Sequence, residues 1–316
     1  MSVASFLKAE HGTAFSFEVL PPLRGNSIDT LFSSVERLMQ FNPAYINITT
    51  HRTEVVYKEV SAGIFQRTTE RKRPGTVAIA AALKSRYGVA TVPHVICSGF
   101  TPSELENELI DLSYLGITDL LVLRGDKAKA DSRFIADAGG YNHAVELCEQ
   151  VSAFNRGQML DGTTHEILMP FSFGVAGYPE KHEEAMNLDI DIEHLKAKID
   201  AGAEYIVTQM FFDNAKYFDF VDRCRAAGID VPIIPGLKPL TSLTQQALLP
   251  KTFHIDLPME LASELVKCNT NDDVKALGVE WGTMQAKELK AAGVPSIHFY
   301  SMNAVASIEQ IAKKVY

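Results

Sequence analysis

Short runs of apolar and β-branched residues recur along the chain, and each is followed by a longer segment with apolar residues at helical spacing. The runs are dense in Val, Ile, Phe and Tyr rather than strictly alternating, which is typical of strands buried on both faces of a parallel sheet. They predict eight strands, at Ala14–Val19, Tyr45–Thr49, Thr91–Ile96, Asp119–Leu123, Ser172–Ala176, Tyr205–Met210, Val231–Ile234 and Ser296–Tyr300.

The segments between these runs predict helices. Ser103 and Glu106 have the spacing of a capping box at the start of one of them. Glycines follow four of the helices, where a left-handed C-terminal residue is expected. The helices are expected at Ser27–Phe41, Pro102–Tyr114, His143–Phe154, Ile192–Ala201 and Asn214–Ala226, and the terminating glycines are Gly116, Gly202, Gly228 and Gly293.

Eight strands that alternate with helices, without an obvious linker, predict a (β/α)8 TIM barrel that forms a single domain over residues 1–316. A doubly wound sheet is the structural alternative. It needs a glycine-rich turn after its first strand, where this chain has Pro21-Pro22-Leu23-Arg24. Three longer connections would be elaborated loops of the barrel, and the last of them has room for two or three helices: Lys127–Tyr141, Asn155–Pro170 and Thr241–Lys290.

Composition indicates an ordinary globular protein, because 46% of the 316 residues are hydrophobic and 22% are charged. Thirty basic and 39 acidic residues give a net charge of −9, which argues against a nucleic-acid partner. Four scattered cysteines without metal-ligand spacing predict free thiols and no metal site. The first residues lack a signal-peptide core, and no apolar stretch approaches the roughly 20 residues that span a bilayer. We therefore expect a soluble cytoplasmic protein without a membrane partner.

Glu18 ends the first predicted strand among Phe, Val, Leu and Pro residues. An ionised carboxylate is costly in apolar surroundings, so its pKa should be raised, as a general acid near neutral pH requires. A glutamate held in a structural ion pair is an equally weighted alternative.

Other polar residues stand at or near the ends of the predicted strands: Thr49, Thr50, His94, Arg124, Gly125, Asp126, Tyr178, His182 and Gln209. The triplet Arg124–Asp126 offers two opposite charges around a glycine that permits close backbone approach, although a turn with a local ion pair explains it equally well. P-loop, nucleophile-elbow and metalloprotease motifs are absent. The set suits binding of a flat heterocycle and movement of a hydride or proton, with a cofactor that supplies the reactive atom.

Several short segments, in their order along the chain, resemble the methylenetetrahydrofolate reductase family, the flavin-dependent barrel enzymes of one-carbon metabolism that supply methyl groups for methionine biosynthesis. Each segment alone is weak, but together they cover nearly the whole chain. They are Phe15–Pro22, Pro93-His94, Leu123–Asp126, Gly177–His182, Asp200–Ala203, Thr208–Asp213, Pro235-Gly236 and His298–Asn303.

The resemblance implies roles for single residues. Glu18 matches the family's acid, which protonates the folate and opens its five-membered ring to a 5-iminium cation. Asp126 matches an aspartate that contacts the pterin and lies near the flavin, and Gln209 and Gln245 match folate contacts. The FAD contacts would be Thr49, His94, Arg124, Gly125, Asp126, Tyr178, His182, Ala185, Asp191 and Lys198.

The implied activity is a ping-pong reduction of 5,10-methylenetetrahydrofolate to 5-methyltetrahydrofolate through FAD, with NADH or NADPH as electron donor. Family members are commonly dimers or tetramers, so a homo-oligomer is expected. The sequence ends soon after the eighth strand and its helix, so no adenosylmethionine control is expected within it.

The chain departs from the family pattern at three places. Ala304 follows Asn303 where the family usually has an Arg that helps to hold the folate's glutamate tail, and Leu249 stands where the family has an aromatic residue. The connection Asn155–Pro170 is longer than in the common bacterial form. Lys238 is a candidate to replace the lost positive charge. Two alternatives therefore stay open: another FAD-dependent barrel oxidoreductase, similar to proline dehydrogenase, or a non-catalytic flavin- or folate-binding subunit.

Overall fold

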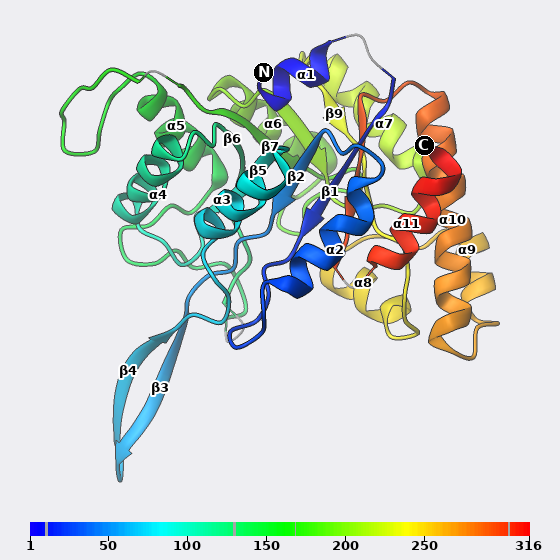
Figure 1. Ribbon diagram of the computed structural model, residues 1–316, viewed down its shortest axis with the longest axis horizontal. Coiled ribbons are helices and arrows are strands. Elements are labelled where there is room, and N and C mark those ends of the chain that lie inside the picture. The colour runs from blue at the N-terminus through cyan, green and yellow to red at the C-terminus, as the bar shows by residue number, and fades with distance from the viewer. Residues whose placement is uncertain (10–11, 129–130, 168, 303) are drawn as a thin grey trace.

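The computed structural model describes residues 1–9, 12–128, 131–167, 169–302 and 304–316 (Figure 1). Its strands are β1 (Ala14–Val19), β2 (Tyr45–Ile48), β3 (Glu54–Ser61), β4 (Ile64–Glu70), β5 (Ala90–Ile96), β6 (Asp119–Leu123), β7 (Ser172–Gly177), β8 (Tyr205–Thr208), β9 (Ile233–Ile234), β10 (Gly236–Leu237) and β11 (Ser296–Tyr300). Its helices are α1 (Val3–Lys8), α2 (Asp29–Met39), α3 (Thr76–Tyr87), α4 (Pro102–Tyr114), α5 (Ala144–Asn155), α6 (Leu188–Asp200), α7 (Asn214–Ala226), α8 (Gln245–Phe253), α9 (Met259–Leu265), α10 (Asn271–Ala291) and α11 (Val305–Val315).

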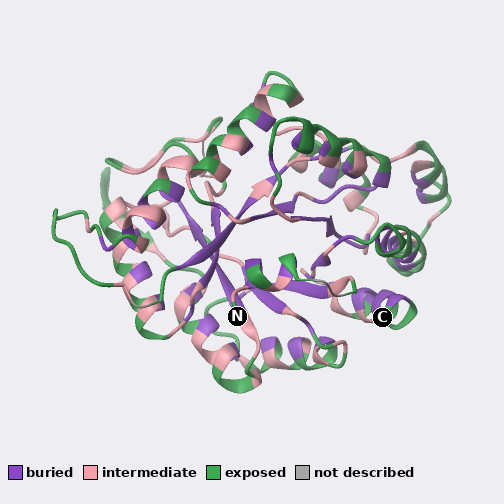
Figure 2. Ribbon diagram, turned by 90° about the horizontal axis from the view of Figure 1, so that it is seen from above, coloured by how far each residue is buried: buried purple, intermediate pink, exposed green. Residues whose placement is uncertain are grey.

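The main sheet is parallel and has the strand order β10-β11-β1-β2-β5-β6-β7-β8-β9. Its two end strands, β9 and β10, are the halves of one extended segment that is interrupted at Pro235, a residue without a backbone N–H. The carbonyl of Pro235 accepts a hydrogen bond from His298 N at 2.9 Å, which carries the ladder across the interruption. The sheet therefore closes on itself, and buried strands meet at the centre of a ring of helices (Figure 2). The predicted (β/α)8 barrel is confirmed and the doubly wound alternative is wrong.

The predicted strand bounds match where an apolar run ends sharply. β1, β6 and β11 have the predicted bounds, whereas β8 ends at Thr208, two residues before the predicted end at Met210. The prediction of Val231–Ile234 missed the continuation beyond Pro235, because proline normally ends a strand in sequence patterns.

The helices match the predicted pattern better than their caps do. α4 and α7 have the predicted bounds, but the predicted capping box at Ser103 and Glu106 is wrong. The box is formed by Thr101 and Glu104 instead, since Pro102 occupies the first turn and moves the N-cap to the residue before it. The four glycines predicted to terminate helices all have positive φ, from 63° to 112°.

Apolar side chains form two main layers. The larger layer fills the space between the strands and the surrounding helices. A second, separate cluster contains only residues of strands and of α1, among them Leu121, Tyr205 and Val207, so it fills the barrel interior and α1 covers its end. Gly174 is required beside it, because a Cβ at this position would lie 2.2 Å from the Tyr205 ring.

The hairpin of β3 and β4 is absent from the predicted elements. It is antiparallel, connects β2 to α3, and extends away from the barrel (Figure 1). It therefore projects from the barrel face at which the parallel strands end, the face that carries the active site in barrels of this class.

Two of the long connections lie at opposite ends of the barrel. Residues 127–141 follow strand β6, whereas residues 155–170 follow helix α5 and precede strand β7, which places them at the opposite face. The third connection contains α8, α9 and α10, in agreement with the predicted two or three helices. Within the described ranges, no helix has the length and apolar character needed to cross a membrane.

Candidate active site

Glu18 lies near the end of β1 and is 6% exposed. Burial raises the pKa of this carboxyl from 4.5 to about 7, while the Thr49 hydroxyl and the positive charge of Lys238 act in the opposite direction. The carboxyl therefore has the raised pKa that its apolar neighbours in the sequence predict. At neutral pH a large fraction of the side chain carries a proton that it can donate.

His94, on β5, brings a second titratable group to Glu18. Its Nε2 lies 3.4 Å from Oε2 of Glu18, without the geometry of a hydrogen bond. Burial lowers the pKa of His94 to about 3, and the nearby His51 acts in the same direction. Because the imidazole stays neutral, this contact is not an ion pair, and the positive charge that acts on Glu18 is that of Lys238.

Two threonines follow β2 beside these groups. The buried Thr49 hydroxyl makes no hydrogen bond of standard geometry among the described residues, although it lies close enough to the Glu18 carboxyl to lower the pKa of that group. Thr50 bonds the Thr76 hydroxyl and the carbonyl of His94, so it fixes the end of β2 against β5. Thr49 is thus the one of the two whose hydroxyl could serve a ligand.

The triplet after β6 lies in irregular backbone with no assigned turn, and its ion pair is not internal. Arg124 pairs with Glu184 through both guanidinium ends, one of them at 3.1 Å, and its guanidinium lies 4.6 Å from the Phe134 ring centre. Gly125 has φ of +80°, and a Cβ there would lie 3.0 Å from Ser98. Asp126 is exposed, and its carbonyl accepts a hydrogen bond from Ser98 at 2.6 Å.

The segment after β7 is held by Asp191, in the first turn of α6. The Oδ2 of Asp191 accepts a hydrogen bond from His182 N at 2.8 Å, and the His182 ring lies edge-on to Tyr178 with centres 4.8 Å apart. Burial lowers the pKa of His182, and the charge of Arg124 lowers it further. Tyr178, His182, Asp191 and Arg124 are therefore neighbours, as a shared binding surface requires.

Lys198 and Ala185 complete this group. The Lys198 ammonium donates to the carbonyl of Ala176 at 2.8 Å, and partial burial of the side chain lowers its pKa. Ala185 is 8% exposed, and its carbonyl accepts a hydrogen bond from Lys181 at 2.7 Å. A half-buried ammonium with one carbonyl acceptor among the described residues is suited to a further anionic partner.

The two glutamines differ in their contacts. Gln209 lies directly after β8, and its Oε1 accepts only from the backbone N of Met210, at 2.9 Å. Gln245 opens α8, and its Oε1 accepts hydrogen bonds from the backbone N of Thr241 and of Ser242. The Gln245 side chain is therefore engaged in closing its own loop.

The residues that depart from the family pattern, together with Lys238, are buried wherever the structure describes them. Lys238 is 6% exposed, contributes positive charge at Glu18, and has its Nζ 3.5 Å from the Met302 carbonyl. Leu249 is buried in a small core with Phe212 and Leu261, and Ala304 is buried before α11. Asn303 lies outside the described residues.

Three polar residues on the strands next to β1 were not identified as site residues from the sequence: Asn47 and His298 are buried, and Tyr300 is partly buried. Asn47 pairs with Glu18 in the β1–β2 register, and neither its Oδ1 nor its Nδ2 has a hydrogen-bond partner among the described residues. His298 and Tyr300 of β11 pair with Ser16 and Glu18. The available signal was a polar residue at alternate positions of an otherwise apolar strand, which places it in the barrel interior.

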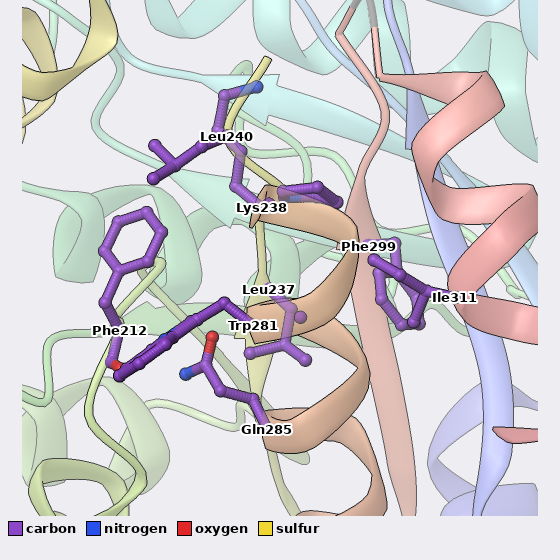
Figure 3. Close-up of a pocket in the computed structure, with 11 residues that line it drawn as sticks. Phe212, Leu237, Lys238, Leu240, Trp281, Gln285, Phe299 and Ile311 are labelled. Atoms are coloured by element: carbon purple, nitrogen blue, oxygen red, sulfur yellow. The ribbon is translucent and has the colours of Figure 1, made fainter. Parts of the chain in front are cut away.

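A cavity of about 10 Å³ lies between α10 and the segments that follow β8 and β10 (Figure 3). Phe212, Trp281 and Gln285 line one side of it, and the Trp281 Nε1 donates to the Phe212 carbonyl at 2.9 Å. This space holds one water molecule at most. The hydrogen bond from Trp281 ties α10 to the segment that follows β8. In the described part of the chain, no group of three or more His, Cys, Asp or Glu side chains is arranged to hold a metal ion.

Comparison with known sequences points to one family. The model of the methylenetetrahydrofolate reductase family matches residues 4–316. The 5,10-methylenetetrahydrofolate reductase of Escherichia coli is 31% identical over 289 residues, which cover 91% of this chain and 86% of that protein. Methylenetetrahydrofolate reductase (NADH) 1 of Arabidopsis thaliana is 30% identical over 92% of this chain, and the chain spans 46% of the length of that relative.

Comparison with solved structures supports the fold. An uncharacterised protein from Clostridium thermocellum, described as binding two copies of 5-methyl-5,6,7,8-tetrahydrofolic acid, superposes with a TM-score of 0.56 over 98% of this chain and 97% of that one. At 14% sequence identity, this likeness shows a shared barrel and no more.

Proposed function

Because the chain belongs to the methylenetetrahydrofolate reductase family, we propose that it reduces 5,10-methylenetetrahydrofolate to 5-methyltetrahydrofolate, with a nicotinamide nucleotide as electron donor and FAD as cofactor. The observation that carries the proposal is the buried carboxyl of Glu18, with a pKa of about 7, at the end of the barrel where the strands terminate.

Glu18 would act as the general acid of folate reduction. Its proton passes to N10 of the folate, the bond between N10 and the methylene carbon breaks, and a 5-iminium cation forms. Addition of a hydride to the methylene carbon then gives the methyl group. Glu18 is left as a carboxylate that regains its proton from water, and a pKa of about 7 makes both directions accessible at neutral pH.

The surroundings of Glu18 have opposing effects on its pKa. Lys238 stabilises the carboxylate after transfer, whereas burial favours the protonated form before it. His94 is neutral and cannot compete by forming an ion pair at neutral pH. The balance of these effects sets the Glu18 pKa near the pH at which the group must work.

The residues assigned to FAD fit such a group in the chemistry of their donors. The half-buried Lys198 ammonium lies near Asp191, and the Arg124 guanidinium lies near Tyr178 and His182, so the two cations suit a pyrophosphate. Gly125 lets a ligand approach the backbone, and the unpartnered Thr49 hydroxyl can bond a polar ring edge. Tyr178, His182, Ala185 and Asp191 would complete the surface. When bound, FAD supplies the hydride-transfer chemistry between the nucleotide and the folate.

Asp126 and Gln209 would face the folate, because both follow strands at this end of the barrel and neither carboxylate nor amide is buried in the core. Gln245 would reach it only through its Nε2, since its Oε1 is engaged in the loop at Thr241. Within the family, relatives named for NADH and for NADPH both match this chain, so either nucleotide is a candidate donor.

An anaerobic visible spectrum of the purified protein, before and after addition of 5-methyltetrahydrofolate, tests the proposal. We expect a bound flavin whose absorbance bleaches when the folate is added. A flavin that responds to the nicotinamide nucleotide but not to the folate would favour a different barrel oxidoreductase. A protein that binds flavin or folate without any electron transfer would be a binding subunit.

A further inference from the structure

The hairpin formed by residues 54–70, here called the arm, has no support from the rest of the chain near its tip. Every residue from 57 to 67 is exposed, on both faces of the two strands. Large apolar side chains are among them: Tyr57 is 66% exposed, Val60 59%, Ile64 60% and Phe65 59%. A two-stranded hairpin is only marginally stable in water without a surface to pack against.

One face of the arm concentrates the aromatic side chains together with opposite charges. Tyr57 pairs with Arg67 and Glu59 pairs with Phe65 in the antiparallel register, and residues at paired and alternate positions share a face. Two rings, one guanidinium and one carboxylate therefore lie together on that face. A bulge follows Glu59 and places Val60 next to it.

Such a face is complementary to a second copy of itself. In a two-fold contact between two such faces, each copy presents two rings, a guanidinium and a carboxylate to the same set of groups on the other copy. Phe and Tyr rings bury roughly 150–250 Å² each when fully covered, so two arms supply several hundred Å² towards the roughly 1,600 Å² of a standard interface. The mixed charges of the face avoid the repulsion that a uniformly charged face would suffer.

We propose that the arm is a homodimerisation element, and that its Tyr57–Phe65 face packs against the same face of a second copy of this chain. The contact is isologous, so each chain contributes the same residues. The proposal does not depend on the enzymatic activity, since residues 57–67 of the arm include neither Glu18 nor any residue assigned to FAD.

Sedimentation velocity of the full chain over a range of micromolar concentrations tests the proposal. We expect a dimer for the unmodified chain and at least about a 30-fold weaker dimer after the double substitution Tyr57→Ser/Phe65→Ser, because buried aromatic anchors carry much of the binding free energy of an interface. Tyr114→Ser is the matched control: Tyr114 is 91% exposed on α4, and its removal should leave the dimer unchanged.

A charge exchange sharpens the test. Arg67→Glu should weaken the dimer, and addition of Glu59→Arg to the same chain should restore it, since the face again carries one charge of each sign. Because these four side chains are exposed, the variants should keep the circular dichroism spectrum of the unmodified chain. A monomeric unmodified chain, an undiminished dimer in Tyr57→Ser/Phe65→Ser, or association that only a different protein induces would overturn the proposal.

Discussion

The barrel interior is polar on one side and apolar on the other. The strands β11, β1, β2 and β5 place His298, Ser16, Glu18, Tyr45, Asn47 and His94 in it. The strands β6, β8 and β9 contribute Leu121, Val207 and Ile234 to the interior cluster. Both sides are almost fully buried, so the contrast is one of chemistry and not of solvent access.

The polar side is energetically expensive. The Tyr45 hydroxyl, both amide atoms of Asn47, and Nε2 of His94 and of His298 have no hydrogen-bond partner among the described residues. Each such buried group costs roughly 1–3 kcal/mol if it stays unpaired. A barrel needs none of these groups for packing, as its apolar side demonstrates. Unpaired buried groups of this kind gather at functional sites, where stability is given up, and here they lie on the strands around Glu18.

The largest expected effect is on the rate of folate reduction, and it comes from a substitution on the polar side. Glu18→Gln removes the proton donor but keeps the shape of the side chain, so reoxidation of the reduced flavin by methylenetetrahydrofolate should slow by roughly 10²- to 10⁴-fold. Flavin reduction by the nucleotide should be unchanged. Stopped-flow absorbance of the two half-reactions measures both rates, and an equal loss in both would show that the assigned role of Glu18 is wrong.

On the apolar side, substitution should cost stability and leave the chemistry intact. Leu121→Ala removes a side chain that is 4% exposed in the interior cluster, and a destabilisation of roughly 2–5 kcal/mol is expected from lost burial and the cavity that remains. Urea unfolding measures the change. The rate of the folate half-reaction in the folded variant should stay near the rate in the unmodified chain. A loss of that rate without unfolding would show that the apolar side also contributes to the chemistry.

The titratable groups of the polar side should also make the free energy of unfolding depend on pH. The folded pKa of Glu18 is about 7 and its unfolded value 4.5, so its contribution is fully present below pH 4.5 and is lost as the pH rises through 7. At 1.36 kcal/mol per pKa unit, the change is roughly 3 kcal/mol. His94 and His298, whose pKa values burial lowers to about 3, act in the opposite sense, since they lose stability as the pH falls below 6.5.

The contribution of Glu18 is therefore best measured as a difference. The difference in unfolding free energy between the unmodified chain and Glu18→Gln should be constant below pH 4.5. Between pH 4.5 and pH 7.5 it should shift in favour of Glu18→Gln. A difference that does not vary with pH would mean that Glu18 is ionised in the folded protein.

The apolar side could be predicted from the sequence far better than the polar one. Runs such as Asp119–Leu123 identify their strand because burial on both faces requires apolar residues, and eight such runs identify the barrel. Glu18 was found because a carboxylate in an apolar strand is conspicuous. Asn47 was not, since the alternation of polar and apolar residues in a four-residue strand is too short to stand out before pairing places Asn47 beside Glu18.

Two further features depend on contacts that a linear pattern does not contain. The arm mixes polar and apolar residues on both faces without regular alternation and has no core to face, so its sequence lacks the periodicity of a buried strand. Lys238 follows Pro235 and Gly236 in the chain, but its charge matters because closure of the barrel brings it to Glu18. Both depend on how distant segments come together in space.

The smallest expected effect compares two tyrosines at the two sides. Tyr45 and Tyr205 are both fully buried in the interior cluster. The Tyr205 hydroxyl donates to the Leu120 carbonyl at 2.9 Å, whereas the Tyr45 hydroxyl lies near Ser16 and Ser296, whose hydroxyls bond each other at 3.2 Å. Tyr205→Phe should therefore destabilise the protein by roughly 0.5–1.5 kcal/mol, the net contribution of one hydrogen bond.

Tyr45→Phe should be neutral or slightly stabilising, because it removes a buried hydroxyl that has no bond of its own to lose. Both variants keep the ring and its packing, so the difference between their urea midpoints isolates the hydroxyl. If Tyr45→Phe lost as much stability as Tyr205→Phe, the Tyr45 hydroxyl would have to be satisfied in the folded protein, and the polar side would be less costly than its unpaired atoms indicate.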